Sequence, residues 1–228
     1  MTDKAQRSML KSAPAMVTMV IGLLLLLAAL WRWREVGWGG LVWLAALLAT
    51  TAIRWPHSMR NRANAVVASR KDATERALLA AMFLGAMLLP LFHLATPLLR
   101  FADYDLPDRA TAIGALLQLP YLWLFWRSHA DLGRNWSVGL EVHDTHALIT
   151  NGIYAHIRHP MYAAIWISAL AQPLLIHNWI AGLFVVPAFA AMWFLRVPHE
   201  EALMHERFGA DWDAYCARSG RLWPRGAS

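Results

Sequence analysis

Long apolar runs alternate with polar stretches along this chain of 228 residues. An apolar run of about 17–25 residues is long enough to cross the hydrocarbon core of a bilayer as a helix. Runs close to this length occupy residues 14–31, 38–53, 77–99, 110–126, 160–176 and 179–197. We therefore predict an all-α integral membrane protein with about six transmembrane helices and no Rossmann domain. Only His177 and Asn178 separate the last two runs, which predicts a tight helical hairpin.

The chain after the sixth run is polar but keeps a regular set of large apolar residues. Leu203, Phe208, Trp212 and Tyr215 follow spacings typical of one face of a helix. We predict an amphipathic helical tail, which Gly209 divides into two short helices.

Charged residues give the predicted helices an orientation. The segments 54–76 and 127–158 and the tail are basic and fall on one side of six spans, while the loop 100–109 is acidic and falls on the other. Cytoplasmic loops of membrane proteins are rich in Lys and Arg. The basic side and both termini are therefore predicted to be cytoplasmic. Arg32 and Arg34 are exceptions that can snorkel from span ends. The Ala-, Trp- and Arg-rich, Lys-poor composition favours a bacterial inner membrane.

Composition narrows the class of protein further. Only 16% of the residues are charged, against about 25% in soluble domains, so a separate water-soluble domain is not expected. The net charge of +6 fits basic cytoplasmic loops, and no basic patch points to nucleic-acid binding. The single cysteine, Cys216, excludes a disulfide within one chain. We divide the chain into N-terminal transmembrane helices at 1–126 and a functional core at 127–228.

Polar chemistry concentrates immediately before the fifth run. Asn151-Gly152 predicts a turn, and Arg158, His159 and Pro160 open the next helix. The free N–H groups at a helix start attract an anionic group. A second interpretation is that Arg158 and His159 only mark the membrane interface, as positive residues do at the ends of cytoplasmic spans.

A second polar cluster ends the sixth run. Arg196 and Glu200 are four residues apart, so on a helix they share a face and can pair. Pro198 lies between them and predicts a kink or a new helix. Because the two clusters bracket one apolar hairpin, we predict that they lie on the same side of the membrane. A solvated interfacial pair would explain the second cluster if it stood alone.

Taken in order, the two clusters resemble a known family. The motifs GIYAHIRHPMY at residues 152–162 and LRVPHEEALMHERFGADWDAYCARSGRLWP at 195–224, with an apolar hairpin between them, are similar to isoprenylcysteine carboxyl methyltransferases. Phospholipid N-methyltransferases share the RHP-x-Y and EE core. The resemblance spans about residues 131–224, and the earlier runs match only as generic apolar helices.

The resemblance implies a methyltransferase that binds S-adenosylmethionine in a cytosolic pocket above the membrane helices, without a metal. The acceptor would be a lipophilic small molecule or a prenyl thioether within the bilayer. Arg196 would hold the acceptor carboxylate, and Arg158 and Glu201 are possible additions. The implied cofactor contacts are His146, Ala147, Leu148, Ile149, Tyr154, His159, Pro160, Met161, Tyr162 and Glu200.

Two departures from the eukaryotic pattern concern the ligands. The stretch SVGLEV at Ser137–Val142 lacks the glutamine that eukaryotic members carry there, so Glu141 is a possible substitute. The ending SGRLWPRG also differs from that of eukaryotic members. This difference bears on whether the substrate is a prenylated protein more than on whether the cofactor binds. The acceptor group therefore stays open between a carboxylate, an amine and a thiol, including phospholipid or small-thiol substrates.

Two other classes of protein compete with this interpretation. The ten histidines, with His143-x-x-His146 and His156-x-x-His159, suggest a membrane metal oxygenase, although the paired-histidine boxes of that class are missing. A carrier or assembly factor would be expected to show ionisable groups in mid-span. Here the charged clusters lie at the predicted interface, which favours the methyltransferase.

Overall fold

The computed structural model describes residues 2–35, 37–61, 68–69, 73–133, 141–142 and 148–225. These residues are mainly helical, as predicted, with one antiparallel pair of two-residue strands. In chain order the elements are α1 (Thr2–Trp31), α2 (Gly37–Asn61), β1 (Ala68–Ser69), α3 (Ala73–Phe83), the π-helix η1 (Leu84–Leu88), α4 (Leu89–Ala95), the 3-10 turn η2 (Arg100–Ala102), α5 (Asp108–Leu132), β2 (Glu141–Val142), the 3-10 turn η4 (Gly152–Ala155), α6 (Pro160–Leu175), α7 (Val185–Phe208) and α8 (Ala210–Arg218).

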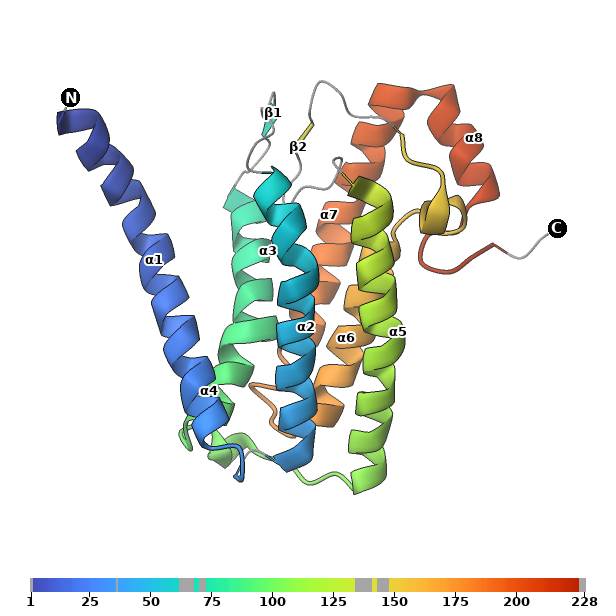
Figure 1. The fold of residues 1–228 in the computed structure, drawn as a ribbon. Helices are drawn as coiled ribbons and strands as arrows, with labels where there is room; N and C mark the ends of the chain where they lie inside the picture. The colour runs from blue at the N-terminus through green and yellow to red at the C-terminus, as the bar shows by residue number, and fades with distance from the viewer. Residues whose placement is uncertain are drawn as a thin grey trace.

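The long helices form a bundle in which α2, α3, α5, α6 and α7 run side by side (Figure 1). Helix α1 meets the others only near its C-terminal end, where Ala29 packs against Leu91 and Leu94, and its N-terminal half leans away. Helix α8 lies at the end of the bundle away from the C-terminus of α1, beside the last turns of α7, and we call this end the site end. There α2 and α5 finish, and α3 and α6 begin.

A buried glutamine ties four parts of the bundle together. The Nε2 atom of Gln172 on α6 donates to the carbonyl oxygen of Gly85 at 2.8 Å and to that of Ala181 at 3.0 Å. Its Oε1 accepts from Nε1 of Trp43 on α2 at 3.2 Å. A π-helix departs from the i→i+4 hydrogen-bond pattern and a loop has none, and an unpaired buried polar group is costly. Gln172 therefore stabilises the irregular backbone next to α6.

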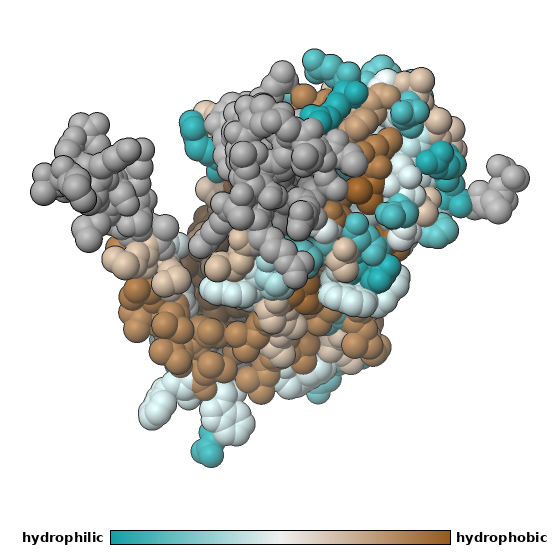
Figure 2. All heavy atoms as spheres, turned by 45° about the horizontal axis from the view of Figure 1, so that its top comes forward, coloured by the Kyte–Doolittle hydropathy of each residue, from teal (hydrophilic) through white to brown (hydrophobic). Residues whose placement is uncertain are grey.

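Apolar side chains cover much of the outside of the bundle. Figure 2 shows them along its sides, while polar atoms gather over α7 and α8 at the site end. Among the described residues, two helical segments are long and apolar enough to cross a membrane, Gly37–Met59 and Ala73–Ala95. Shorter apolar helices span Met16–Trp31 and Pro160–Leu175. Six spanning helices and a membrane-bound tail stay predictions.

The predicted two-residue link between the last two helices is wrong. Helix α6 ends at Leu175 and α7 begins only at Val185. Asn178 explains the difference, because its Oδ1 accepts from the N–H groups of Ile180 and Ala181 at 3.0 and 2.8 Å. These bonds hold the chain in a turn where an apolar helix had been expected.

Pro198 neither ends α7 nor starts a new helix. Helix α7 continues from Val185 to Phe208 with the proline inside it. It stops at Gly209, whose φ of +50° suits glycine, and α8 follows at once. Trp212 and Tyr215 on α8 are buried, on the face that the sequence spacing predicts for packing.

Candidate active site

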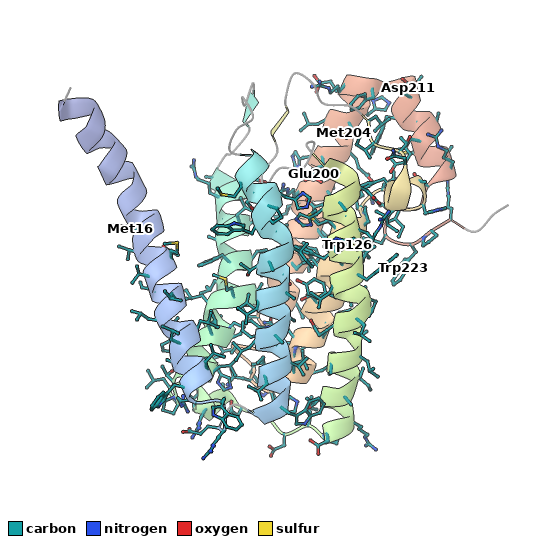
Figure 3. All side chains as sticks on the ribbon, in the orientation of Figure 1. Met16, Trp126, Glu200, Met204, Asp211 and Trp223 are labelled. Atoms are coloured by element: carbon teal, nitrogen blue, oxygen red, sulfur yellow. The ribbon has the colours of Figure 1, made fainter. Side chains whose placement is uncertain are left out.

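The two polar clusters meet at the site end, as predicted from the hairpin. Helix α6 begins at Pro160, and the hydroxyl of Tyr162 donates to Oε1 of Glu200 on α7 at 2.8 Å. Next to this pair, Nε2 of His159 lies 3.0 Å from Oε1 of Glu201. Residues 38 and 42 positions apart in the sequence are thus in direct contact. Figure 3 shows Glu200 on α7, one turn below Met204.

Arg196 lies between two carboxylates. Its Nε donates to Oε1 of Glu200 at 2.9 Å, which confirms the pairing predicted from their spacing. Its Nη1 lies 3.2 Å from Oε1 of Glu75, at the start of α3. Arg196 and Glu75 are 8% and 4% exposed, so this cluster is shielded from water. The guanidinium therefore has two anionic partners before any ligand arrives.

Glu201 faces the C-terminal segment. Its carboxylate accepts from Arg221 with both oxygens, one of them from Nε at 2.9 Å, and Arg158 Nε lies 3.8 Å away. Burial alone would raise the pKa of Glu201, but hydrogen bonds from His159 and Arg221 outweigh it and lower the pKa to about 2. Glu201 is therefore an anion that joins the start of α6 to the tail.

The main chain reinforces this junction. Arg158 N–H donates to the carbonyl oxygen of Gly220 at 2.8 Å, and His159 N–H donates to that of Arg221 at 3.0 Å. The side chain of Arg158 also donates to the carbonyl oxygens of Cys216 and Ser219. The segment before α6 is thus fixed by the tail, and Arg158 has a structural task there.

The predicted turn at Gly152 holds Tyr154 in place. Gly152 has a φ of +57°, and the N–H of Ile153 donates to Oδ2 of Asp131 at 2.8 Å. Tyr154 is buried, and its carbonyl oxygen accepts from the hydroxyl of Tyr215 on α8 at 2.7 Å. Burial raises the pKa of the Tyr154 hydroxyl, which keeps it protonated.

A cavity of about 1040 Å³ connects these groups with the apolar interior. Small-molecule sites have volumes of up to about 1,000 Å³, so this cavity is large for its kind. The predicted residues along its wall are Leu148, Ile149, Tyr154, Arg158, His159, Pro160, Met161, Tyr162, Arg196 and Glu200. His146 and Ala147 lie outside the described residues.

Helices α2 and α3 supply the apolar part of the wall. Trp43 and Ala46 come from α2, and Leu79 and Met82 from α3. The cavity therefore draws on both of the segments into which the sequence was divided, 1–126 and 127–228. That division stays a prediction.

Sequence reasoning did not select Glu75. Glu75 lies within the segment 54–76, which the sequence analysis treats only as basic. The available signal was an acid in the first turn of a helix that is apolar from Ala77 onward. Nothing in the sequence links it to Arg196, because the two are far apart along the chain.

Within the part of the chain that the structure describes, no three His, Cys, Asp or Glu residues are arranged to hold a metal ion. His143 and His146 lie outside that part, so the first of the two histidine pairs is not described. His159 of the second pair contacts Glu201, which accounts for it through an ion-pair network.

Comparison with known proteins points to one family. Residues 113–206 match the sequence profile of the isoprenylcysteine carboxyl methyltransferase (ICMT) family. The predicted resemblance to this family is confirmed. The matched stretch contains Tyr154, His159, Tyr162, Arg196 and Glu200, and it excludes Glu75.

Individual relatives carry the corresponding name. The protein-S-isoprenylcysteine O-methyltransferase of Schizosaccharomyces pombe is 32% identical over 111 residues, 47% of this chain and 45% of that protein. The probable protein-S-isoprenylcysteine O-methyltransferases of Oryza sativa subsp. indica and subsp. japonica are each 27% identical over 88 residues, 38% of this chain and 46% of theirs. The matches thus span somewhat under half the length of these relatives. Together with the apolar helices, the ICMT match indicates a membrane protein.

Proposed function

We propose that this protein is an S-adenosylmethionine-dependent methyltransferase that acts within the membrane on a lipophilic carboxylate, such as that of an isoprenylcysteine. One observation carries the proposal: the Tyr162–Glu200–Arg196 cluster lies on the wall of a cavity that continues into the apolar bundle. A polar cofactor and an apolar acceptor must meet where polar groups adjoin an apolar cavity. The ICMT match supports the same chemistry.

The residues at the cavity suit the cofactor's amino-acid group. Tyr162 and Arg196 both contact Oε1 of Glu200, so we assign Oε2 to the cofactor's ammonium group. The first N–H groups of α6, at Met161 and Tyr162, would receive its carboxylate, because a helix start attracts anions. Tyr154 offers a buried aromatic face on the same cavity wall. Leu148 and Ile149 add apolar surface for the adenine ring.

The reaction makes few demands on proton transfer. When bound, S-adenosylmethionine supplies an electrophilic methyl group on a sulfonium. An acceptor carboxylate is ionised at neutral pH, since its reference pKa is about 4. The protein's part is therefore to align the two groups and to exclude water, and alignment can lower a barrier by about 7–11 kcal/mol. An amine or thiol acceptor would instead need a base, and the imidazole of His159 lies beside Tyr162, with 5.6 Å between the ring centres.

The bundle accounts for a lipophilic acceptor. The cavity wall includes apolar residues of α2 and α3, among them Trp43, Leu79 and Met82, so an acceptor chain dissolved in the bilayer would leave lipid for a similar environment. We propose that the site end faces the cytoplasm, following the basic segments of the sequence. A bacterial inner membrane remains our proposal for the location.

Calorimetric titration of detergent-purified protein with S-adenosylmethionine or its demethylated product tests the proposal. The wild type is expected to bind, and Glu200→Gln is expected to lose about tenfold or more in affinity, since a charged partner is removed. Asp211→Asn, an exposed acid on α8, is the matched control and should bind normally. Failure of folded wild-type protein to bind either compound would overturn the cofactor assignment, and metal analysis would then test the oxygenase alternative.

The acceptor is tested separately. Radiolabelled methyl groups are offered to a panel that contains prenylcysteines, phospholipids and small thiols. Base-labile label in a prenylcysteine product is expected for a carboxyl methyl ester. Label confined to an amine or a thiol would contradict the carboxylate assignment while leaving the methyltransferase assignment intact.

A further inference from the structure

An acidic residue of the N-terminal helices reaches the candidate active site. Glu75 lies in the first turn of α3, outside the residues 113–206 that match the ICMT family. It is 4% exposed, and its Oε1 lies 3.2 Å from Nη1 of Arg196 on α7. A buried ion pair often stabilises a fold no better than apolar side chains of similar size would. The contact therefore points to a role in arranging the site rather than in stability alone.

The contacts of Arg196 form a chain from α3 to the cavity. Its Nη1 faces Glu75, and its Nε donates to Oε1 of Glu200 at 2.9 Å. The same Oε1 accepts from the hydroxyl of Tyr162 at 2.8 Å. Because a guanidinium is planar, contacts at two of its nitrogens set its orientation. Arg196 and Glu200 are among the described residues that line the cavity, and Glu75 supports them from behind.

These contacts also bear on the task of Arg196. The resemblance to the ICMT family implies that this side chain holds the acceptor carboxylate. Its guanidinium already contacts the carboxylates of Glu75 and Glu200, at 3.2 and 2.9 Å. A third carboxylate would approach two negative charges, and like charges repel strongly where water is excluded. Both carboxylates would instead attract the ammonium group of the cofactor, which favours a task for Arg196 in cofactor binding.

We propose that Glu75 is a positioning residue for the methyltransferase: through Arg196 it fixes the carboxylate of Glu200 where the cofactor's ammonium group binds. This inference rests on the proposed function, which assigns Oε2 of Glu200 to that group. A carboxylate that is already held in place loses less conformational entropy when the ligand arrives, so its pre-organisation raises affinity. Leu79 and Met82 of the same helix line the apolar part of the cavity. Helix α3 would therefore contribute to both ligand sites.

A double-mutant cycle on cofactor affinity tests whether Glu75 acts through Glu200. Detergent-purified full-length protein is titrated calorimetrically with S-adenosylmethionine. Glu75→Gln removes the charge at nearly constant shape and is expected to weaken binding about tenfold. In a Glu200→Gln background the same change should weaken binding less than about twofold, because the group that Glu75 positions has lost its charge. Glu75→Asp, which keeps the charge on a shorter side chain, should recover part of the loss.

Two outcomes of the cycle would overturn the proposal. The same loss in both backgrounds would show that Glu75 acts on the fold and not through Glu200, and an unchanged affinity of Glu75→Gln would show that it has no role in binding. If Glu75→Gln fails to fold, the cycle is run with Glu75→Asp, and its smaller loss should again vanish in the Glu200→Gln background. Asp105→Asn, an exposed acid in the loop before α5 at the opposite end of the bundle, is the control and should bind normally. Failure of folded wild-type protein to bind either S-adenosylmethionine or its demethylated product would instead count against the proposed function itself.

Acceptor analogues test the task of Arg196 separately. The probes are an N-acetylated S-farnesylcysteine and its carboxamide, which has the same apolar chain without the charge. Arg196→Gln should weaken binding of S-adenosylmethionine about tenfold and leave the ratio of the acid and carboxamide affinities within about twofold of the wild-type ratio. A selective loss of affinity for the acid, by about tenfold or more, would assign Arg196 to the acceptor and overturn its role in positioning Glu200.

Discussion

At the scale of single residues, two adjacent glutamates have separate tasks. The carboxylate of Glu200 lies on the cavity wall and contacts Tyr162 and Arg196. The carboxylate of Glu201 contacts His159 and Arg221. Neighbouring positions on a helix point about 100° apart. One pair of acids can therefore serve both a ligand site and the junction that holds the site's backbone.

The junction at Glu201 should depend on pH. The pKa of Glu201 is lowered from 4.5 to about 2, so its contribution to stability is present above pH 4.5 and is lost as the pH falls toward 2. Because the network is partly exposed to solvent, we expect a contribution on the order of 1 kcal/mol. Thermal unfolding of wild type and Glu201→Gln in detergent, followed from pH 7 to pH 3, measures it.

The difference between the two proteins is the quantity to follow, since other carboxylates also titrate in this range. Wild type should be more stable than Glu201→Gln at pH 7, and the gap should narrow steadily below pH 4.5. A gap that stays constant across the range would show that the charge of Glu201 does not stabilise the junction.

Short-range residue contacts could be predicted from the sequence, whereas long-range ones could not. The Arg196–Glu200 pair follows from helical spacing alone. The contacts of Arg196 with Glu75, and of Glu201 with Arg221, depend on how helices and tail pack. The periodicity of apolar residues along the sequence does not predict which helices pack together. For the same reason, Glu75 is read from the sequence only as part of a basic loop.

At the scale of elements, the turn η4 (Gly152–Ala155) is held closely by its neighbours. Gly152 has positive φ, and a Cβ added there would clash with the carboxylate of Asp131. That carboxylate also accepts from Ile153 N–H and pairs with Arg127 on α5. The turn is therefore fixed to the end of α5, and this contact positions Tyr154 on the cavity wall.

Gly152→Ala should consequently reduce both stability and cofactor affinity. A non-glycine residue at positive φ costs about 1–3 kcal/mol, and the clash adds to this cost. Gly133→Ala is the matched control, because Gly133 has a φ of +55° with no atom within 4 Å of an added Cβ. Unfolding and calorimetric binding should show a larger loss for Gly152→Ala, with affinity reduced only in that variant. Equal effects would exclude a special role for the turn.

Helix boundaries were predicted where local signals decide them and missed where side chains override them. Pro160 marks the start of α6, and Gly209 separates α7 from α8, as expected. The start of α7 was misplaced because Asn178 caps a turn within an apolar stretch. Pro198 was predicted to kink the helix or to start a new one, and α7 continues through it, so no new helix begins there.

At the scale of the whole molecule, the cavity extends along the bundle from the polar site end. Glu75 and Ala86 lie on the same continuous helical segment, eleven residues apart, which corresponds to roughly 16 Å. Glu75 contacts the Arg196 cluster, and Ala86 lines the deeper part of the wall. The residues around Ala86 should therefore limit the length of the acceptor chain that fits in the cavity.

Filling the cavity at Ala86 should change chain-length preference without affecting cofactor binding. Ala86→Trp is expected to lower kcat/KM for an S-farnesylcysteine by about tenfold relative to the shorter S-geranylcysteine, with affinity for S-adenosylmethionine unchanged, and Ala86→Leu should have a smaller effect in the same direction. Ala80→Trp places the same ring on an exposed position of α3, outside the cavity, and should leave the preference unaltered. If Ala86→Trp folds and both chain lengths lose activity equally, the acceptor does not extend to Ala86. Its apolar chain would then remain in the surrounding lipid, and the cavity would serve mainly the cofactor.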